Sequence, residues 1–182
     1  MFNFEIYTLE SAPARSKPVL ETLQHAFGFI PNIAGAMAGS PTLINSFISV
    51  FQNAHSGSFT EDQIQTLLLT NAVTNASPWP VAFHTFLALK EGLDPADVEA
   101  IRAGHAPKNA KHAALSGLAK SFIEQRGHAS APALQAFFDA GFKEEQVLEL
   151  INVVAASTLT NYVASVTRPP LEASLQAHSW SQ

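Results

Sequence analysis

The chain has 182 residues, of which 47% are hydrophobic and only 14% are charged, and its formal net charge is −5. This length suits one domain, or two small halves that share a core. The ten lysine and arginine residues are scattered along the sequence rather than clustered, so we expect no nucleic-acid partner. The chain contains no cysteine, which excludes disulfides, thiolate catalysis and thiolate metal ligands.

The sequence also carries expectations about membranes and partners. The amino-terminal residues lack a basic stretch followed by an apolar run, so we expect no signal peptide. The longest apolar stretch, residues 148–166, is interrupted by Glu149, Asn152 and Asn161, so we expect no segment of membrane-spanning length. These features predict a cytoplasmic protein. The low fraction of charged residues predicts that a partner covers some apolar surface, and a homo-oligomer is the simplest such arrangement.

Signals for the start and end of helices follow one another along the chain. Ser40 and Pro41 predict a helix that continues to about residue 54, and the capping-box pair Thr60 and Gln63 starts the next one. Patterns typical of strands are almost absent, so the predicted fold class is all-α with about eight helices. The remaining helices are predicted where a cap or a proline opens a segment and a glycine or proline closes it: residues 94–104, 109–126, 131–140 and 143–166.

A short internal echo links two of these helix starts. Residues 57–64 (GSFTEDQI) match residues 140–147 (AGFKEEQV), and each segment opens a long apolar helix that carries Asn and Thr. Two related helical halves packed around a shared core would produce this pattern. Two ordinary helix starts would also produce it, because acidic residues are favoured in the first turn of any helix. The sequence leaves both interpretations open.

The segment from Gln65 to His84 is the most informative about function. Gln65, Ser77, Pro80 and His84 have the spacing of a Glu, two Cys and a His in the carboxymuconolactone decarboxylase and alkylhydroperoxidase AhpD-like superfamily. The chain therefore resembles a divergent member of that superfamily that lacks both cysteines. The resemblance covers about residues 20–172, and it implies that residues 1–182 form a single AhpD-like domain.

The resemblance implies a site in which His84 acts as a general acid or base while Gln65 and Ser77 orient a small-molecule substrate. Gln65 stands where the superfamily has its glutamate, and an amide can form hydrogen bonds but cannot carry a proton away. Ser77 cannot cycle through sulfenic acid and disulfide, so thiol peroxidase chemistry is lost. Trp79 and Phe83 are the candidate substrate-binding residues beside His84.

Each of these residues also has an ordinary structural interpretation. Ser77, which precedes two prolines, suits a helix N-cap. Trp79 suits core packing, and His84 suits a buried histidine whose ring nitrogens are satisfied by hydrogen bonds. Gln65 could be a solvated side chain. Glu61, one turn before Gln65, is either a substitute carboxylate or a first-turn acidic residue.

Three functions are compatible with the resemblance. The first is a cofactor-independent proton-transfer or lyase-type enzyme that acts on a small organic acid or lactone through His84. The second is a non-catalytic oligomeric relative that binds a ligand or serves as a scaffold. The third is an alkylhydroperoxidase-type antioxidant activity by a route that uses no cysteine. The sequence shows no metal-ligand spacing, phosphate-binding glycine loop or nucleophile elbow, so no metal or cofactor is expected.

Overall fold

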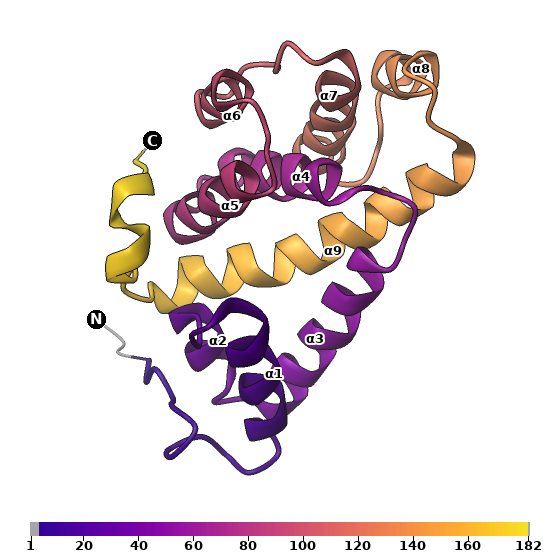
Figure 1. The fold of residues 1–182 in the computed structure, drawn as a ribbon. Coiled ribbons are helices and arrows are strands. Elements are labelled where there is room, and N and C mark those ends of the chain that lie inside the picture. Colours follow the sequence, from indigo (N-terminus) through magenta and orange to yellow (C-terminus); the bar gives the residue numbers. More distant parts are fainter. Residues whose placement is uncertain (1–3, 182) are drawn as a thin grey trace.

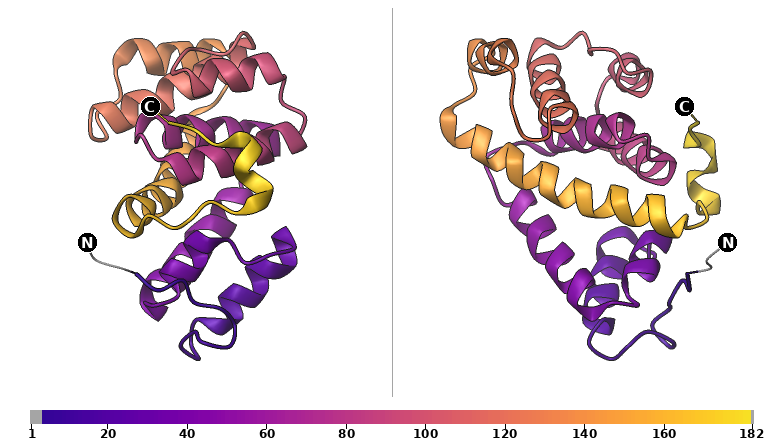
Figure 2. Two further views of the ribbon diagram at one scale, coloured as in Figure 1. Left: turned by 90° about the vertical axis from the view of Figure 1, so that its left-hand side faces the viewer. Right: turned by 180° about the vertical axis from the view of Figure 1, so that it is seen from behind.

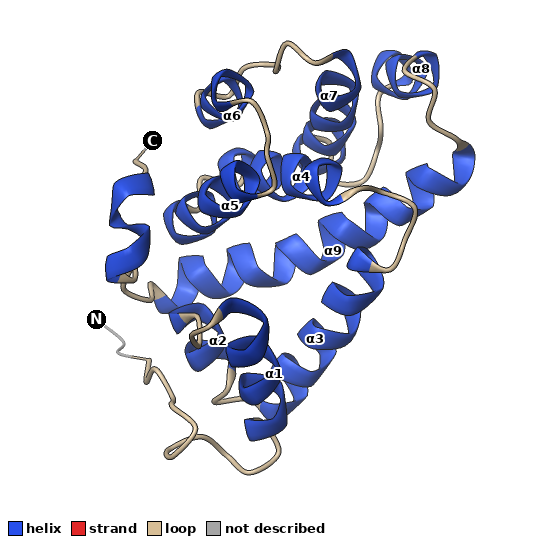
Figure 3. Ribbon diagram, viewed as in Figure 1, coloured by secondary structure: helices blue, strands red, loops and turns tan. Residues whose placement is uncertain are grey.

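The computed structural model describes residues 4–181, which form nine α-helices and one 3-10 helix. Figure 3 shows only helices and loops in this range, and this confirms the predicted all-α class. Eight of the α-helices have eight or more residues, in agreement with the predicted number. The expectation of no signal peptide concerns in part residues 1–3, which lie outside the described range.

Helices α1 (Lys17–Phe27), α2 (Asn32–Met37) and α3 (Pro41–His55) form the layer at the bottom of Figure 1. Helix α3 begins where the sequence predicts, because the Ser40 hydroxyl accepts a hydrogen bond from Leu43 N at 3.3 Å. It ends one residue beyond the predicted limit. The sequence analysis did not delimit α1 or α2.

Helices α4 (Glu61–Thr74) and α5 (Pro78–Lys90) lie side by side at the centre of the molecule. Helix α4 begins with the predicted capping box, in which Thr60 N donates to the Gln63 side-chain oxygen at 3.2 Å. Residues on all sides of α4 are buried, because it packs against α5, α7 and α9. A side chain on either helix therefore has little access to solvent, and its partners decide its chemistry.

Helices α6 (Pro95–Arg102), α7 (Ala110–Glu124) and α8 (Ala131–Asp139) cover α4 and α5 on the side opposite to α1–α3 (Figures 1 and 2). Their bounds agree with the predicted ranges to within two residues. Gly104 follows α6 with a φ of 76°, a left-handed conformation that favours glycine, so this helix ends where the sequence predicts.

Helix α9 (Glu144–Thr167) is the longest element and crosses the middle of the molecule between the two layers (Figure 1). Lys143 N donates to the Gln146 side-chain oxygen at 3.0 Å, the same arrangement that starts α4. The internal echo of the sequence therefore corresponds to two helix starts with the same hydrogen bond.

The structure changes one expectation about α9. By length and composition this helix could cross a membrane, so the expectation that no segment reaches that length was too strict. Its packing against α2, α3 and α4 is nevertheless that of a core helix. The chain ends in the 3-10 helix η1 (Ala173–His178), which packs against α5.

Candidate functional site

The candidate site is built on facing sides of α4 and α5. Helix α5 begins at Pro78, and both Pro78 and Pro80 lie in its first turn, where the backbone N–H groups have no helical partner. A proline is therefore tolerated at position 80 without loss of a helical hydrogen bond. One turn further along α5, the His84 ring reaches Gln65 on α4, with 3.1 Å between Nδ1 and Oε1.

The hydrogen bond to Gln65 defines the tautomer of His84. An amide oxygen can only accept, so the ring hydrogen is on Nδ1 and Nε2 carries a free lone pair. Burial, and to a smaller extent the charge of nearby His55, lowers the pKa of His84 to about 3. The ring is therefore neutral at physiological pH. It can accept a hydrogen bond or a proton from a ligand at Nε2.

His84 lines a cavity of about 40 Å³. This volume exceeds the roughly 10–15 Å³ that one water needs, so a substituent of a small ligand fits beside the ring. The rest of the lining is almost entirely apolar and aromatic and comes from α1, α2, α3, α4, α5 and α9. Ser157 and Thr160 on α9 are the polar residues that share it with His84. Among the described residues, the lining includes no lysine, arginine or carboxylate.

The predicted substrate-binding residues Trp79 and Phe83 both line this cavity. Their rings stack with centroids 5.1 Å apart, and Phe83 also meets the edge of Phe27 at 5.2 Å. The Trp79 indole N–H donates to Glu172 at 3.0 Å, so it is not available to a ligand. Trp79 and Phe83 therefore offer apolar ring surface to the cavity, and Glu172 holds that wall in place.

Ser77 does not line the cavity, although the sequence placed it in the site. It occupies the N-cap position of α5, as its structural interpretation predicts, but its hydroxyl makes no capping hydrogen bond. The side chain is buried, and its oxygen has no partner among the described residues. Because the N-cap residue has an extended backbone, it does not share the helical face that carries Pro80 and His84.

The sequence analysis did not assign three residues to the site. Ser157 and Thr160 reach the cavity from α9, and nothing in their local sequence marks them. His55, at the end of α3, pairs with Glu61 and is close enough to influence His84 electrostatically. Nothing in the local sequence marks His55 either, because only the structure shows that Phe51, four residues before it, lines the cavity.

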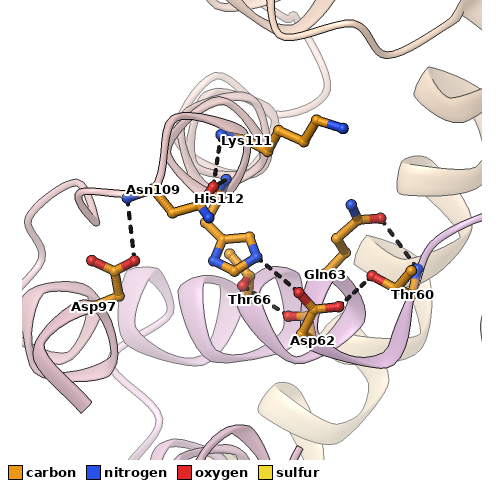
Figure 4. A network of polar contacts seen from close by, with 8 residues as sticks. All are labelled: Thr60, Asp62, Gln63, Thr66, Asp97, Asn109, Lys111 and His112. Atoms are coloured by element: carbon orange, nitrogen blue, oxygen red, sulfur yellow. Dashed lines mark hydrogen bonds and ion pairs between the residues drawn. The ribbon is translucent and has the colours of Figure 1, made fainter. Parts of the chain in front are cut away.

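A second buried histidine contacts the first turn of α4 from α7 (Figure 4). His112 on α7 points toward Asp62, with 3.1 Å between Nε2 and Oδ2. Burial raises the pKa of Asp62, but hydrogen bonds from Thr60 and His112 outweigh this effect and lower it overall. Asn109 caps α7 by accepting from the backbone of Lys111 and His112. No group of three or more metal-binding side chains occurs in residues 4–181.

No family model and no curated protein matches this chain. Solved structures do match it. A structure titled alkylhydroperoxidase AhpD core, an uncharacterized peroxidase-related protein from Ralstonia eutropha JMP134, is 15% identical with a TM-score of 0.80 and covers 95% of this chain and 93% of that one. This chain has the AhpD-like fold. A second AhpD-like structure, an uncharacterized peroxidase-related protein from Silicibacter sp. TM1040, is 18% identical over 92% of this chain and 90% of that one, with a TM-score of 0.77.

The debrominase Bmp8 also has this AhpD-like fold. Its ligand-free structure is 15% identical with a TM-score of 0.77 and covers 91% of this chain and 90% of that one. A variant of Bmp8 in complex with 2,3,4-tribromopyrrole is 16% identical, with the same TM-score, over 96% of this chain and 97% of that one. At these identities the similarity establishes the fold alone. The present AhpD-like chain differs from the superfamily pattern in having no cysteine.

Proposed function

We propose that this cysteine-free AhpD-like protein binds a small, uncharged, largely apolar molecule at the α4–α5 cavity, with one substituent of the molecule inside it, and exchanges a proton with that molecule through His84. The observation that carries the proposal is the neutral His84 ring, which Gln65 holds at Nδ1 while the ring lines an apolar cavity. The reaction class is cofactor-independent proton transfer or a lyase-type step. A lactone is a substrate of the right kind.

The cavity lining favours an uncharged substrate over an organic acid. A carboxylate bound there would lose its hydration, and no cation among the described lining residues would compensate for that loss. A lactone or a neutral ring loses less on entering the same space. The hydroxyl of Ser157 accepts a hydrogen bond from Asn161 at 3.1 Å and can donate its own hydrogen to the carbonyl oxygen of the ligand.

The low pKa of His84 sets a condition on the chemistry. In the empty cavity the ring is a weak base, because burial disfavours its charged form. A substrate that develops negative charge as it loses a proton stabilises the adjacent imidazolium and raises the pKa of His84. Proton transfer is therefore coupled to the formation of an enolate or a similar anion next to the ring.

The second candidate function is binding without turnover, and the same low pKa favours it. A neutral ring that resists protonation is well suited to accept a hydrogen bond from an N–H or O–H group. The debrominase variant of this fold was solved with 2,3,4-tribromopyrrole, a small flat ring with such an N–H. Uncharged pyrroles, phenols and lactones are accordingly the ligands to test first.

The experiment compares thermal shifts of wild type, His84→Phe and a control, His112→Phe, against uncharged pyrroles, phenols and lactones and against matched carboxylates. A ligand at 100 times its Kd adds about 2.7 kcal/mol to the free energy of unfolding. We expect stabilisation by uncharged compounds that is lost in His84→Phe and kept in His112→Phe. Stabilisation by carboxylates alone would contradict the proposal, as would stabilisation that survives in His84→Phe.

Turnover is measured separately with the compounds that bind. Incorporation of solvent deuterium next to the carbonyl group, or ring opening of a lactone, is followed by NMR. A rate above the background that disappears in His84→Phe supports the enzyme. Binding without any such rate supports the second candidate function.

The proposed functional unit is a homo-oligomer that associates through α9. Four large apolar side chains of this helix are between 44% and 69% exposed, which is unusual for a surface left in water: Leu148, Ile151, Tyr162 and Val166. Light scattering should give a mass above the 19.5 kDa of one chain. The double variant Leu148→Glu, Tyr162→Glu should then dissociate. A monomeric wild type at micromolar concentration would contradict this assembly.

A further inference from the structure

His55 lies one helical turn beyond the wall of the cavity. Phe47, Phe51 and His55 are spaced by four residues on α3 and therefore share one face. Phe47 and Phe51 line the cavity, and the rings of Phe51 and His55 are 4.4 Å apart. The imidazole thus continues the row of side chains that leads away from the candidate site.

The two nitrogens of His55 have different surroundings. Nδ1 lies 3.1 Å from both carboxylate oxygens of Glu61, whose side chain is 49% exposed. Nε2 is buried and has no hydrogen-bond partner among the described residues. A buried nitrogen without a partner is costly, so its presence calls for an explanation. When this ring is neutral, Nδ1 donates its hydrogen to Glu61 and Nε2 carries the free lone pair.

Glu61 and Gln65 connect this pair to the candidate site. They are four residues apart on α4 and share one face, so the contact between His55 and Glu61 lies one turn from the contact between Gln65 and His84. A positive charge on His55 would also lower the pKa of His84, so the two rings lie within electrostatic reach of each other. One pair of polar groups, Glu61 and His55, therefore begins at the solvent, and a second pair, Gln65 and His84, lies one helical turn away at the cavity.

We propose that Glu61 and His55 form a proton relay that connects solvent with His84, in place of the carboxylate that Gln65 cannot provide. The inference rests on the proposed function, in which His84 gains and must lose a proton. The relay moves one proton and breaks no other bond. The imidazolium of His84 releases its proton to His55 Nε2, directly or through one water. His55 passes the hydrogen on Nδ1 to Glu61, and Glu61 releases it to solvent.

Other ionisable groups lie close to this relay and enter its pH dependence. His84 faces it from α5 and Glu61 from α4. Glu149 on α9 accepts hydrogen bonds from Ser58 N at 3.0 Å and from its hydroxyl at 2.7 Å, in the loop between α3 and α4. Glu149 is thus a fixed partner of the loop, whereas the half-exposed Glu61 can exchange its proton with solvent.

A purely structural role would also place these two residues together. His55 is in the last turn of α3 and Glu61 in the first turn of α4, where the helix dipoles favour a cation and an anion respectively. An ion pair between helix ends would stabilise the loop without moving protons. The test therefore needs a measurement whose result does not depend on the stability of the loop.

The test measures how fast Nε2 of His84 gains and loses its proton, by NMR relaxation of the ligand-free protein at pH 4 to 5, where the charged form is a minor species. We compare wild type with His55→Gln and Glu61→Gln, and use the exposed His105→Gln and Glu91→Gln as matched controls. The relay predicts exchange about tenfold or more slower in His55→Gln. It predicts a smaller slowing in Glu61→Gln and no change in either control. Backbone amide exchange in α5 corrects for any opening of the fold.

Equal exchange rates in wild type and Glu61→Gln would overturn the relay, and so would slowing in the controls that matches the slowing in Glu61→Gln. The Glu61 side chain is half-exposed, and Glu61→Gln retains its shape, so we expect this variant to fold. It therefore still tests the relay if His55→Gln does not fold. No ligand is needed. A failed relay therefore leaves the binding test untouched, and a failed binding test leaves the exchange result standing.

Discussion

Two buried histidines from different helices contact α4, and their chemistry differs. His84 on α5 pairs with the amide of Gln65 and lines a cavity, whereas His112 on α7 pairs with the carboxylate of Asp62. Asp62 is also hydrogen-bonded by Thr60 and joins the first turn of α4 to α7 (Figure 4). A carboxylate partner makes His112 part of the scaffold. A neutral partner leaves His84 uncharged and free to react at Nε2.

The difference shows that burial alone does not identify a functional histidine. Both rings are less than 10% exposed, and both have one hydrogen-bonded nitrogen. The partner and the adjacent space distinguish them. Variants that change the surroundings of His84 can therefore be compared with variants near His112, and the reverse.

The largest expected effect is on packing. Phe137 stacks on Phe142 in the closed core on the α7 side and is fully buried, so Phe137→Ala should cost about 3–5 kcal/mol. Phe83 lies beside the existing cavity, so Phe83→Ala should cost less, near 3 kcal/mol. Urea denaturation of both variants measures the difference. Equal losses would mean that the cavity region is packed as tightly as the core beside α7.

The amide partner of His84 can be replaced by a carboxylate, which is the kind of partner that His112 has. Gln65→Glu places a carboxylate against the ring and should raise the pKa of His84 by about 1 to 3 pH units. Titration of the histidine side chains by NMR measures this change. Gln63→Glu, two residues away on the same helix, is the control and should leave His84 unaffected. An unchanged His84 in Gln65→Glu would show that burial alone determines its charge.

The depressed pKa of His84 predicts a loss of stability in acid. Below the unfolded pKa of about 6.5, the unfolded chain binds a proton at this histidine and the folded chain does not. The free energy of unfolding should therefore fall by up to about 1.4 kcal/mol per pH unit between pH 6.5 and the folded pKa of about 3.

A comparison of wild type with His84→Gln isolates the contribution of His84 to this acid sensitivity. His84→Gln should flatten the pH dependence of unfolding, which is measured by urea denaturation at pH 7, 6, 5 and 4. Asp62 has a lowered pKa, so its contribution is present above its unfolded value and is lost only at lower pH. Parallel curves for wild type and His84→Gln would contradict the assignment.

The last prediction is that one activity, the consumption of hydroperoxide, is absent. Because the chain has no cysteine, the purified protein should not consume hydroperoxide with a dithiol reductant. Turnover above a heat-inactivated control that is abolished in His84→Ala would show that this site supports peroxide chemistry by a route without thiols. Activity that persists in His112→Ala would then show that the loss in His84→Ala does not come from replacing a buried histidine in general.

Local signals explain which parts of the fold the sequence could predict. Caps and glycines mark the ends of α3, α4 and α6–α9, because each depends on a few neighbouring residues. The short helices α1 and α2 were not delimited. A resemblance of spacing to a known family placed Gln65 and His84 in one site, and the structure adds the hydrogen bond between them.

The rest of the candidate site depends on tertiary packing. Ser157 and Thr160 line the cavity from α9, and His55 lies beside the lining residue Phe51 on α3. Only the complete fold shows that these two helices meet there. Ser77 was expected to face the substrate, but its N-cap conformation removes it from the lining. Spacing along one helix predicts a shared face, and it does not predict which distant helix completes the site.

An NMR spectrum that correlates the nitrogens and hydrogens of the histidine rings, recorded from pH 7 to pH 4, tests whether His84 is a neutral proton acceptor. We expect His84 to remain neutral over this whole range with its hydrogen on Nδ1. A titration of His84 near pH 6.5, or a hydrogen on Nε2 instead, would contradict it. Either result would mean that the ring facing the cavity is not the neutral proton acceptor on which the proposed function depends.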